Sequence, residues 1–134
     1  MSLIEDIKLE EGYRQFPYRC TAGKLTIGYG FNLDDVGISK EEANLILNYR
    51  IRNIQGQVKS TLYDLKAPNE VWEILYHLAY QLGLNGLLKF KKMIKALYAY
   101  DYKTAANEML DSLWAKQIPN RANRLSDQMR NIKV

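Results

Sequence analysis

The alternation of apolar and polar residues at the start of the chain predicts a short helix followed by a β-hairpin. The helix spans Leu3–Glu11 and ends at Gly12, a typical residue just past a helix C-terminus. Residues 13–30 then alternate aromatic or β-branched with polar side chains around a turn at residues 21–24. Pro17 cannot donate a hydrogen bond to a neighbouring strand, so its strand is predicted to lie at the sheet edge. The inward side of the helix is predicted to hold Leu3, Ile4, Ile7 and Leu9.

The next segment combines a loop and a long helix. Residues 32–37 are rich in turn formers and predict a loop. Ser39 and Glu42 have the spacing of a capping box, which predicts the start of a long helix that reaches about Lys59. One face of this helix carries its apolar residues, which are Leu47, Ile51, Ile54 and Val58.

The remainder of the chain reads as helical. Apolar residues at 71–82 cover nearly every face of one helix, which is typical of a central, buried helix, and Gly83 is predicted to end it. Further helices are predicted at residues 87–100, 101–113 and 119–130, the last with a proline in its first turn.

These elements predict an α+β fold in a single domain of 134 residues. We expect a small β lobe at residues 12–38, a long connecting helix at 39–60, and an all-helical lobe at 61–134 together with 1–11. Such an arrangement predicts a cleft between the lobes, and clefts of this kind often bind ligands.

The composition excludes an intramolecular disulfide and one class of zinc site. Cys20 is the only cysteine and His77 the only histidine, so neither an intramolecular disulfide nor a Cys/His zinc cluster can form. We expect no metal and no cofactor. The N-terminal residues lack the pattern of a signal peptide, and no stretch approaches the roughly 18 apolar residues of a membrane span. The protein is therefore expected to accumulate in the cytoplasm of the cell that makes it, without stable membrane association.

The charge balance is basic, with a net charge of +4 and a pI of about 9.1. A basic surface favours an anionic partner, which could be nucleic acid, anionic lipid or the acidic polymers of a bacterial envelope. A solvated, mildly basic surface without any such partner is the plainer interpretation of the charge alone. The Lys and Arg residues are scattered and form no known nucleic-acid motif, which argues against a nucleic-acid binder.

Three residues form the constellation with the clearest chemistry: Glu11 ends the first predicted helix, Cys20 lies at the hairpin turn, and Thr26 lies in the second predicted strand. Their spacings are nine and six residues. With the run at residues 22–30 they resemble the catalytic segment of phage-type lysozymes, a glycoside hydrolase family. The family pattern is Glu, eight residues, Asp or sometimes Cys, five residues, and Thr.

The resemblance continues in the second half of the chain. Residues 80–83, Tyr-Gln-Leu-Gly, are similar to the family's aromatic-Gln-Met/Leu-Gly segment. Trp114 and residues 119–124 are similar to its Trp…Pro-Asn-Arg-Ala-x-Arg segment. The similarity thus covers nearly the whole chain and implies a lysozyme-like fold.

The resemblance implies a role for each residue of the constellation. Glycosidic cleavage needs an acid that protonates the leaving oxygen and a second group that manages water or the cation. Glu11 matches the general acid of the family. Burial in an apolar cleft would keep such an acid protonated. Without the motif, a glutamate at this position would be interpreted as a solvated residue at a helix end. Arg121 matches an arginine that pairs with this glutamate; it would orient Glu11 while favouring its ionised form, or it is simply an exposed arginine.

Cys20 replaces the commoner aspartate, and three roles are open for it. As a thiolate it could attack the sugar; it could polarise a water held jointly with Thr26; or it could fill space while Thr26 and the backbone place the water. The neighbouring Arg19 and Lys24 favour a lowered thiol pKa. The plain alternatives are a small buried hydrophobe at position 20 and a β-branched strand residue at position 26.

Substrate contacts follow from the same resemblance. Gly30 and Gly28 let the backbone approach a sugar or shape a bend, and Asn32 lies where the family lines its cleft. Tyr80 either stacks on a sugar or packs in the core. Glu108 falls near a cleft asparagine of the family. Phe31 stands where the family often has histidine, so the salt bridge of that histidine is missing.

The resulting functional hypothesis is a muramidase that hydrolyses the bond between N-acetylmuramic acid and N-acetylglucosamine of peptidoglycan during phage-mediated host lysis. It would act as a monomer and reach the wall through lesions made by a holin. A lytic transglycosylase would use the same glutamate without water, but Thr26 favours hydrolysis. A non-catalytic wall-binding protein would explain the lost aspartate, yet binding alone requires neither Glu11 nor Thr26.

Overall fold

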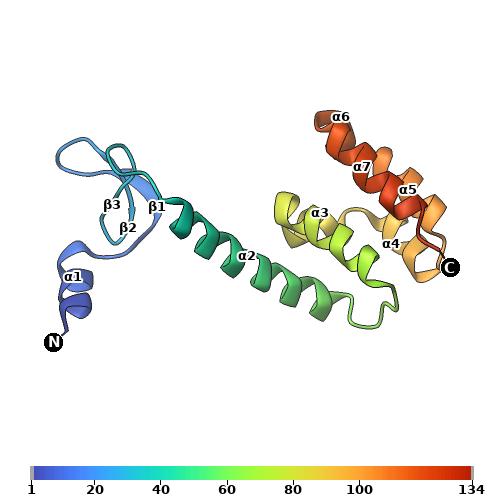
Figure 1. The fold of residues 1–134 in the computed structure, drawn as a ribbon, viewed down its shortest axis with the longest axis horizontal. Coiled ribbons are helices and arrows are strands. Elements are labelled where there is room, and N and C mark those ends of the chain that lie inside the picture. Colours follow the sequence, from blue (N-terminus) through green and yellow to red (C-terminus); the bar gives the residue numbers. More distant parts are fainter. Residues whose placement is uncertain (1, 134) are drawn as a thin grey trace. The chain divides into compact units, whose positions relative to one another are not determined.

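The computed structural model describes residues 2–133, which form seven α-helices and one three-stranded sheet (Figure 1). These residues fall into two compact units, one up to Ile46 and the other from Leu47. The predicted α+β class is confirmed, whereas the assignment of residues 1–11 to the helical lobe and the cleft between lobes stay predictions. In chain order the elements are α1 (Leu3–Glu11), β1 (Arg14–Arg19), β2 (Leu25–Gly28), β3 (Phe31–Asn32), α2 (Lys40–Thr61), α3 (Asn69–Leu88), α4 (Lys91–Tyr98), α5 (Tyr102–Leu110), α6 (Leu113–Gln117) and α7 (Pro119–Arg130).

Helix α1 begins at a side-chain capping box and ends at a glycine. The Ser2 hydroxyl accepts from the Glu5 backbone N–H at 3.1 Å, and the Glu5 carboxylate accepts from the Ser2 N–H at 3.2 Å. Gly12 follows the helix with φ of 70°, and its N–H donates to the Lys8 carbonyl. The predicted limits of this helix are therefore confirmed.

The sheet is antiparallel in the order β1-β2-β3, and its centre is the strand that holds Thr26. Thr26 pairs with Tyr18 on one side and with Asn32 on the other. The hairpin and the edge position of Pro17 are confirmed. Strand β3 was not predicted: Asn32 was assigned to the loop and Phe31 to no element, but the turn at Tyr29–Gly30, where Gly30 has φ of 72°, returns the chain alongside β2.

The N-terminal unit has little apolar interior. Within residues 2–46 only Thr26 is buried, at 4% exposure. Within this unit nothing covers the predicted inward side of α1, since Leu3, Ile4, Ile7 and Leu9 are all exposed, and the packing of this side against the helical lobe stays a prediction. The unit is too small to provide an apolar layer beneath the helix. Polar contacts must therefore contribute much of what fixes its local geometry.

Helix α2 confirms the predicted capping box. The Ser39 N–H donates to the Glu42 carboxylate at 2.8 Å, and the Glu42 N–H donates to the Ser39 hydroxyl at 3.1 Å. The helix then runs to Thr61, two residues beyond the predicted end. Its residue Val58 belongs to the apolar core of the C-terminal unit.

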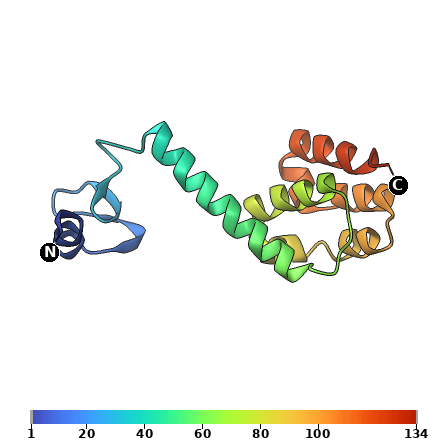
Figure 2. The same cartoon turned by 60° about the horizontal axis from the view of Figure 1, so that its bottom comes forward.

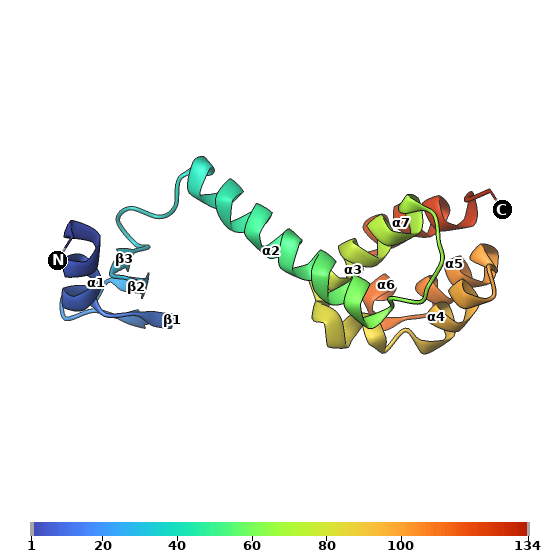
Figure 3. The same cartoon turned by 90° about the horizontal axis from the view of Figure 1, so that it is seen from below.

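The C-terminal unit is built around α3. Its residues Val71, Leu75 and Leu78 are completely buried, which confirms the predicted central helix, although Tyr80 is 48% exposed. Helix α7 contacts α3, α5 and α6, and α4 contacts α5, as Figures 2 and 3 show. This packing gives the unit one continuous core.

The shorter helices differ from their predicted limits. The backbone leaves helical geometry at Gly83, with φ of 76°, but another turn continues to the end of α3. The predicted helix at 87–100 is thus divided between α3 and α4. Asp101 and Ser112 accept the backbone N–H groups of Thr104 and Ala115, each at 3.1 Å, and so start α5 and α6 separately. Within residues 2–133 we find no helix with the length and apolarity needed to cross a membrane.

Candidate active site

The carboxyl group of Glu11 lies directly against the backbone of Gly30. A Cβ atom placed on Gly30 would overlap the Glu11 carboxylate oxygen and would lie 2.7 Å from its Cδ atom. The two residues come from the end of α1 and from the turn between β2 and β3. Because Gly30 has no side chain, the carboxyl group of Glu11 can lie against its backbone.

Gly28 makes room for another side chain of the same unit. A Cβ on Gly28 would lie 2.7 Å from the Phe31 ring. That ring meets Tyr29 edge to face, with centroids 6.5 Å apart, and Tyr29 in turn lies 5.6 Å from the Tyr13 ring. Of the two interpretations of this glycine, sugar approach and a local bend, the position of Phe31 favours a structural role.

Cys20 and Thr26 share one backbone acceptor, the carbonyl of Lys24. The Cys20 N–H and the Thr26 hydroxyl both donate to this oxygen, each at 2.9 Å. The Gly23 N–H donates back to the Cys20 carbonyl at 2.8 Å and closes the turn. The sequence-predicted pair is therefore brought together at the tip of the hairpin.

The pKa of the Cys20 thiol is lowered from its ordinary value, as the sequence predicted, but for a different reason. Hydrogen bonds with the backbone at Lys24 and then Ala22 have the largest effects, partial burial opposes them, and the Thr26 hydroxyl adds a smaller lowering. The cationic side chains expected to act on the thiol are engaged elsewhere: Arg19 pairs with Asp34 and Lys24 with Asp35.

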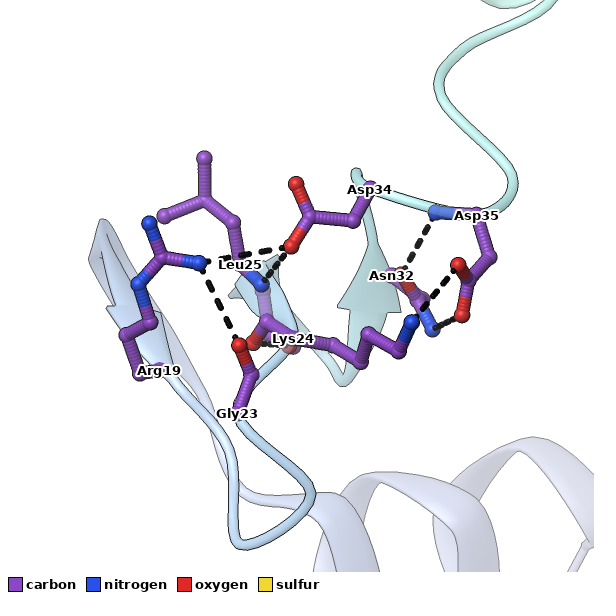
Figure 4. A network of polar contacts seen from close by, with 8 residues as sticks. Arg19, Gly23, Lys24, Leu25, Asn32, Asp34 and Asp35 are labelled. Atoms are coloured by element: carbon purple, nitrogen blue, oxygen red, sulfur yellow. Dashed lines mark hydrogen bonds and ion pairs between the residues drawn. The ribbon is translucent and has the colours of Figure 1, made fainter.

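Asn32, a predicted substrate contact, takes part in a polar network with the following loop (Figure 4). Its amide nitrogen donates to the Asp35 carboxylate at 3.0 Å, and its amide oxygen accepts from the Asp35 N–H at 3.0 Å. The Lys24 ammonium also donates to the Asp35 carboxylate, at 3.1 Å. Neither aspartate of this loop was singled out from the sequence, because a loop carboxylate shows no pairing partner in sequence spacing.

In the C-terminal unit, Tyr80 and Arg121 line a common pocket of about 390 Å³. Its other walls include Ile51 and His77. Burial first, and then the charges of Arg124 and Arg121, lower the pKa of His77, which therefore remains neutral near pH 7. The pairing of Arg121 with Glu11 stays a prediction.

Gln81 links two residues of the C-terminal motif. Its side-chain oxygen accepts from the Trp114 Nε1–H at 3.0 Å and from the Arg121 guanidinium at 3.1 Å. Trp114 is only 4% exposed. The sequence resemblance included all three positions but assigned no role to Gln81; its place in the motif was the available signal.

We expect Gln81→Leu to lower the free energy of unfolding by about 1–2 kcal/mol, because the Trp114 indole and the Arg121 guanidinium lose their shared acceptor. Gln81→Glu, which keeps acceptor oxygens, is the matched control and should stay close to the parent. Urea unfolding followed by tryptophan fluorescence measures both. Equal destabilisation by the two substitutions would contradict the acceptor role.

Glu108 lines a different pocket of the same unit, of about 610 Å³. The Phe90 and Trp114 rings form part of its wall and meet edge to face, 6.2 Å apart. The structure thus places Glu108 apart from the pocket of Tyr80 and Arg121. No cluster of three or more His, Cys, Asp or Glu side chains suited to a metal ion occurs within residues 2–133.

Comparison with known proteins gives a consistent result. The family model described as phage lysozyme matches residues 8–129. The probable T4-type lysozyme 1 of Dictyostelium discoideum is 37% identical, with 93% of this chain and 92% of the relative aligned. An endolysin of Acyrthosiphon pisum secondary endosymbiont phage 1 is 28% identical, with 82% of this chain and 75% of the relative aligned. The pre-baseplate central spike protein Gp5 of Enterobacteria phage T4 is 28% identical over 94% of this chain, which spans only 27% of that longer protein.

Proposed function

Because the chain belongs to the phage lysozyme family and is therefore a peptidoglycan hydrolase of the lysozyme class, we propose that it cleaves the β-1,4 bond between N-acetylmuramic acid and N-acetylglucosamine. The observation that carries the assignment of residues is local. The Glu11 carboxyl group lies against Gly30, and the Cys20 N–H and the Thr26 hydroxyl both donate to the Lys24 carbonyl of the hairpin. These are the acid and the water-managing pair that glycoside hydrolysis requires.

Thr26 and Cys20 can hold the attacking water between them. The Thr26 hydroxyl donates its hydrogen to the Lys24 carbonyl, so its oxygen remains an acceptor. A water that donates one hydrogen to this oxygen and the other to the Cys20 sulfur keeps a lone pair for attack on the anomeric carbon. The lowered pKa of the thiol increases the thiolate fraction that can take up the proton of this water.

The proposed step balances with Glu11 as a neutral carboxylic acid. Glu11 gives its proton to the leaving sugar oxygen as the bond between that oxygen and the anomeric carbon breaks. The oxygen of the water bonds to the anomeric carbon from the opposite face, and a proton of the water passes to the Cys20 thiolate. Among the three roles open for Cys20, the shared contact with Thr26 favours this one, and it predicts inversion at the anomeric carbon.

Further parts of the proposal concern substrate and setting. Gly30, Asn32, Tyr80 and Glu108 are proposed substrate contacts, and Arg121 is proposed to orient Glu11. The similarity to an endolysin supports a role in phage-mediated host lysis, with access to the wall through a holin lesion. Peptidoglycan is the proposed partner, and the basic net charge of +4 suits an anionic wall.

The test is to digest purified peptidoglycan and to identify the released muropeptides by mass spectrometry. We expect products with N-acetylmuramic acid at the reducing end. Anhydro products, lighter by one water, would indicate a lytic transglycosylase and contradict hydrolysis. Reducing-end N-acetylglucosamine, or no release from any wall type, would contradict the proposed bond.

The same digestion tests Cys20. We expect Cys20→Ser to lower the initial rate about 100-fold, because a serine hydroxyl cannot take up a proton near neutral pH. Cys20→Asp, which restores a carboxylate base, should retain most of the parent rate. If Cys20→Ser releases muropeptides at the parent rate, the thiol takes no part in proton transfer and only supports the turn.

A further inference from the structure

A single peptide group, the one between Lys24 and Leu25, connects the candidate catalytic pair to the loop that follows the sheet. Its carbonyl oxygen accepts from the Cys20 N–H and from the Thr26 hydroxyl, each at 2.9 Å. Its N–H points the other way and donates to the Asp34 carboxylate at 2.7 Å (Figure 4). This peptide plane is therefore hydrogen-bonded to both Cys20 and Thr26 on one side and to Asp34 on the other.

Asp34 holds the hairpin at a second point as well. The same carboxylate oxygen accepts from the Arg19 guanidinium at 3.4 Å, and that guanidinium donates to the Gly23 carbonyl at 3.2 Å. The two points of attachment, Arg19 and Leu25, are a cross-strand pair. One directly precedes Cys20 and the other directly precedes Thr26.

We propose that Asp34 is a positioning residue that fixes the Lys24–Leu25 peptide plane and, through it, the geometry of the Cys20–Thr26 pair. This inference rests on the proposed function of that pair. Asp34 touches no reacting atom in the proposed mechanism, and its effect passes through the backbone.

Of the two contacts that Asp34 makes with the hairpin, the hydrogen bond from the Leu25 N–H is the stronger. A carboxylate that accepts from a backbone N–H forms a charge-assisted bond, and such bonds are about twice as strong as neutral ones. It also polarises the peptide group, which strengthens the carbonyl as the acceptor of Cys20 and Thr26. The ion pair with Arg19 is exposed, with 67% and 40% side-chain exposure, and contributes little.

Apolar packing offers no substitute for Asp34. Thr26 is the only buried residue within residues 2–46, so apolar packing does not immobilise the tip of the hairpin. The turn itself contains Ala22 and Gly23, both exposed. Cys20 directly precedes this exposed turn and depends on supporting contacts, and misplacement of a catalytic group by about 1 Å can cost roughly 100-fold in rate.

Asp35 provides a matched control in the same loop. Its carboxylate accepts from the Lys24 ammonium at 3.1 Å and from the Asn32 amide at 3.0 Å. Within residues 2–133, the Asp35 carboxylate forms no hydrogen bond with the backbone of the hairpin. Asp35→Ala therefore removes the same charge from the same loop without releasing the peptide plane.

The experiment compares Asp34→Ala, Asp34→Asn and Asp35→Ala with the parent in two measurements. The first is kcat and KM on soluble peptidoglycan fragments. The second is the pH dependence of alkylation of Cys20 by iodoacetamide, which reports on one site because the chain has a single cysteine. Circular dichroism verifies that each variant is folded.

For Asp34→Ala we expect kcat to fall roughly 10- to 100-fold with KM nearly unchanged. The midpoint of its alkylation profile should rise, by about half a pH unit, because the turn no longer holds its N–H groups against the sulfur. Loss of a nearby negative charge alone would move the midpoint down, so the sign separates positioning from charge. Asp34→Asn keeps an acceptor oxygen for Leu25 but forms only a neutral, weaker bond, so it should recover part of the lost kcat, and Asp35→Ala should not raise the midpoint.

The inference is overturned if Asp34→Ala matches Asp35→Ala in kcat and in the alkylation midpoint while the parent is active. In that case the proposed function stands and only the positioning role fails. If the parent releases no muropeptides, the proposed function fails, and the alkylation midpoints still decide whether Asp34 holds the turn.

Discussion

Glu11→Gln should lower kcat for muropeptide release by about 1,000-fold while the protein keeps its fold and stability. Glutamine has nearly the same shape as glutamate and fits the same space against Gly30, but its amide cannot protonate the leaving sugar oxygen. The loss should appear in kcat rather than in KM, because proton donation is needed in the transition state and not for binding. Initial rates of reducing-end release measure it.

Glu10→Gln is the matched control for this prediction. Glu10 is the preceding residue of α1, it is exposed like Glu11, and its substitution removes the same charge from the same helix end. It should keep the rate within about twofold, since exposed charges act weakly through water. A Glu11→Gln variant with more than about a tenth of the parent rate would exclude Glu11 as the general acid.

Local signals account for the parts of the fold that the sequence predicted. The capping box at Ser39 and Glu42 and the terminating Gly12 act within a few residues, so their spacing is readable and the structure confirms both. Strand β3 was missed because two residues carry no alternation of their own; it exists through pairing with β2. The start of α5 was displaced because Asp101 acts as an N-cap and not as a helical residue.

The candidate site, like the fold, was predicted from the sequence only where the signal was local. The motif identified Glu11, Cys20 and Thr26, and the structure shows the latter two sharing a carbonyl. The sequence could not reveal that Asp34 bonds to Leu25, a contact across a turn and a strand. It also misjudged the cause of the lowered thiol pKa, since proximity in sequence suggested cationic side chains whereas backbone hydrogen bonds are responsible.

The role of Gly30 shows how steric information enters only with the structure. From the sequence, this glycine was read as a place for sugar to approach or for a bend. The structure adds that its missing Cβ is the space that the carboxyl group of Glu11 occupies. The distance between them along the chain is 19 residues, so no local pattern could link the two.

Gly30→Ala should therefore abolish most activity, with kcat reduced at least about 100-fold. Two effects add: a methyl group would overlap the Glu11 carboxylate, and alanine at φ of 72° is strained by about 1–2 kcal/mol. The added Cβ is fixed to the backbone of residue 30, so it is the Glu11 side chain that must move away from its position. The measurement is kcat on soluble peptidoglycan fragments together with the thermal midpoint.

Gly37→Ala separates the two effects because Gly37 also has a positive φ, of 65°, while the nearest atom to an added Cβ is the Leu33 carbonyl oxygen at 4.0 Å. It carries similar backbone strain without any contact to Glu11. Both variants should lose similar amounts of stability, and only Gly30→Ala should lose the greater part of its kcat. If the two variants lose activity equally, backbone strain alone explains the effect, and the close approach of Glu11 to Gly30 has no part in catalysis.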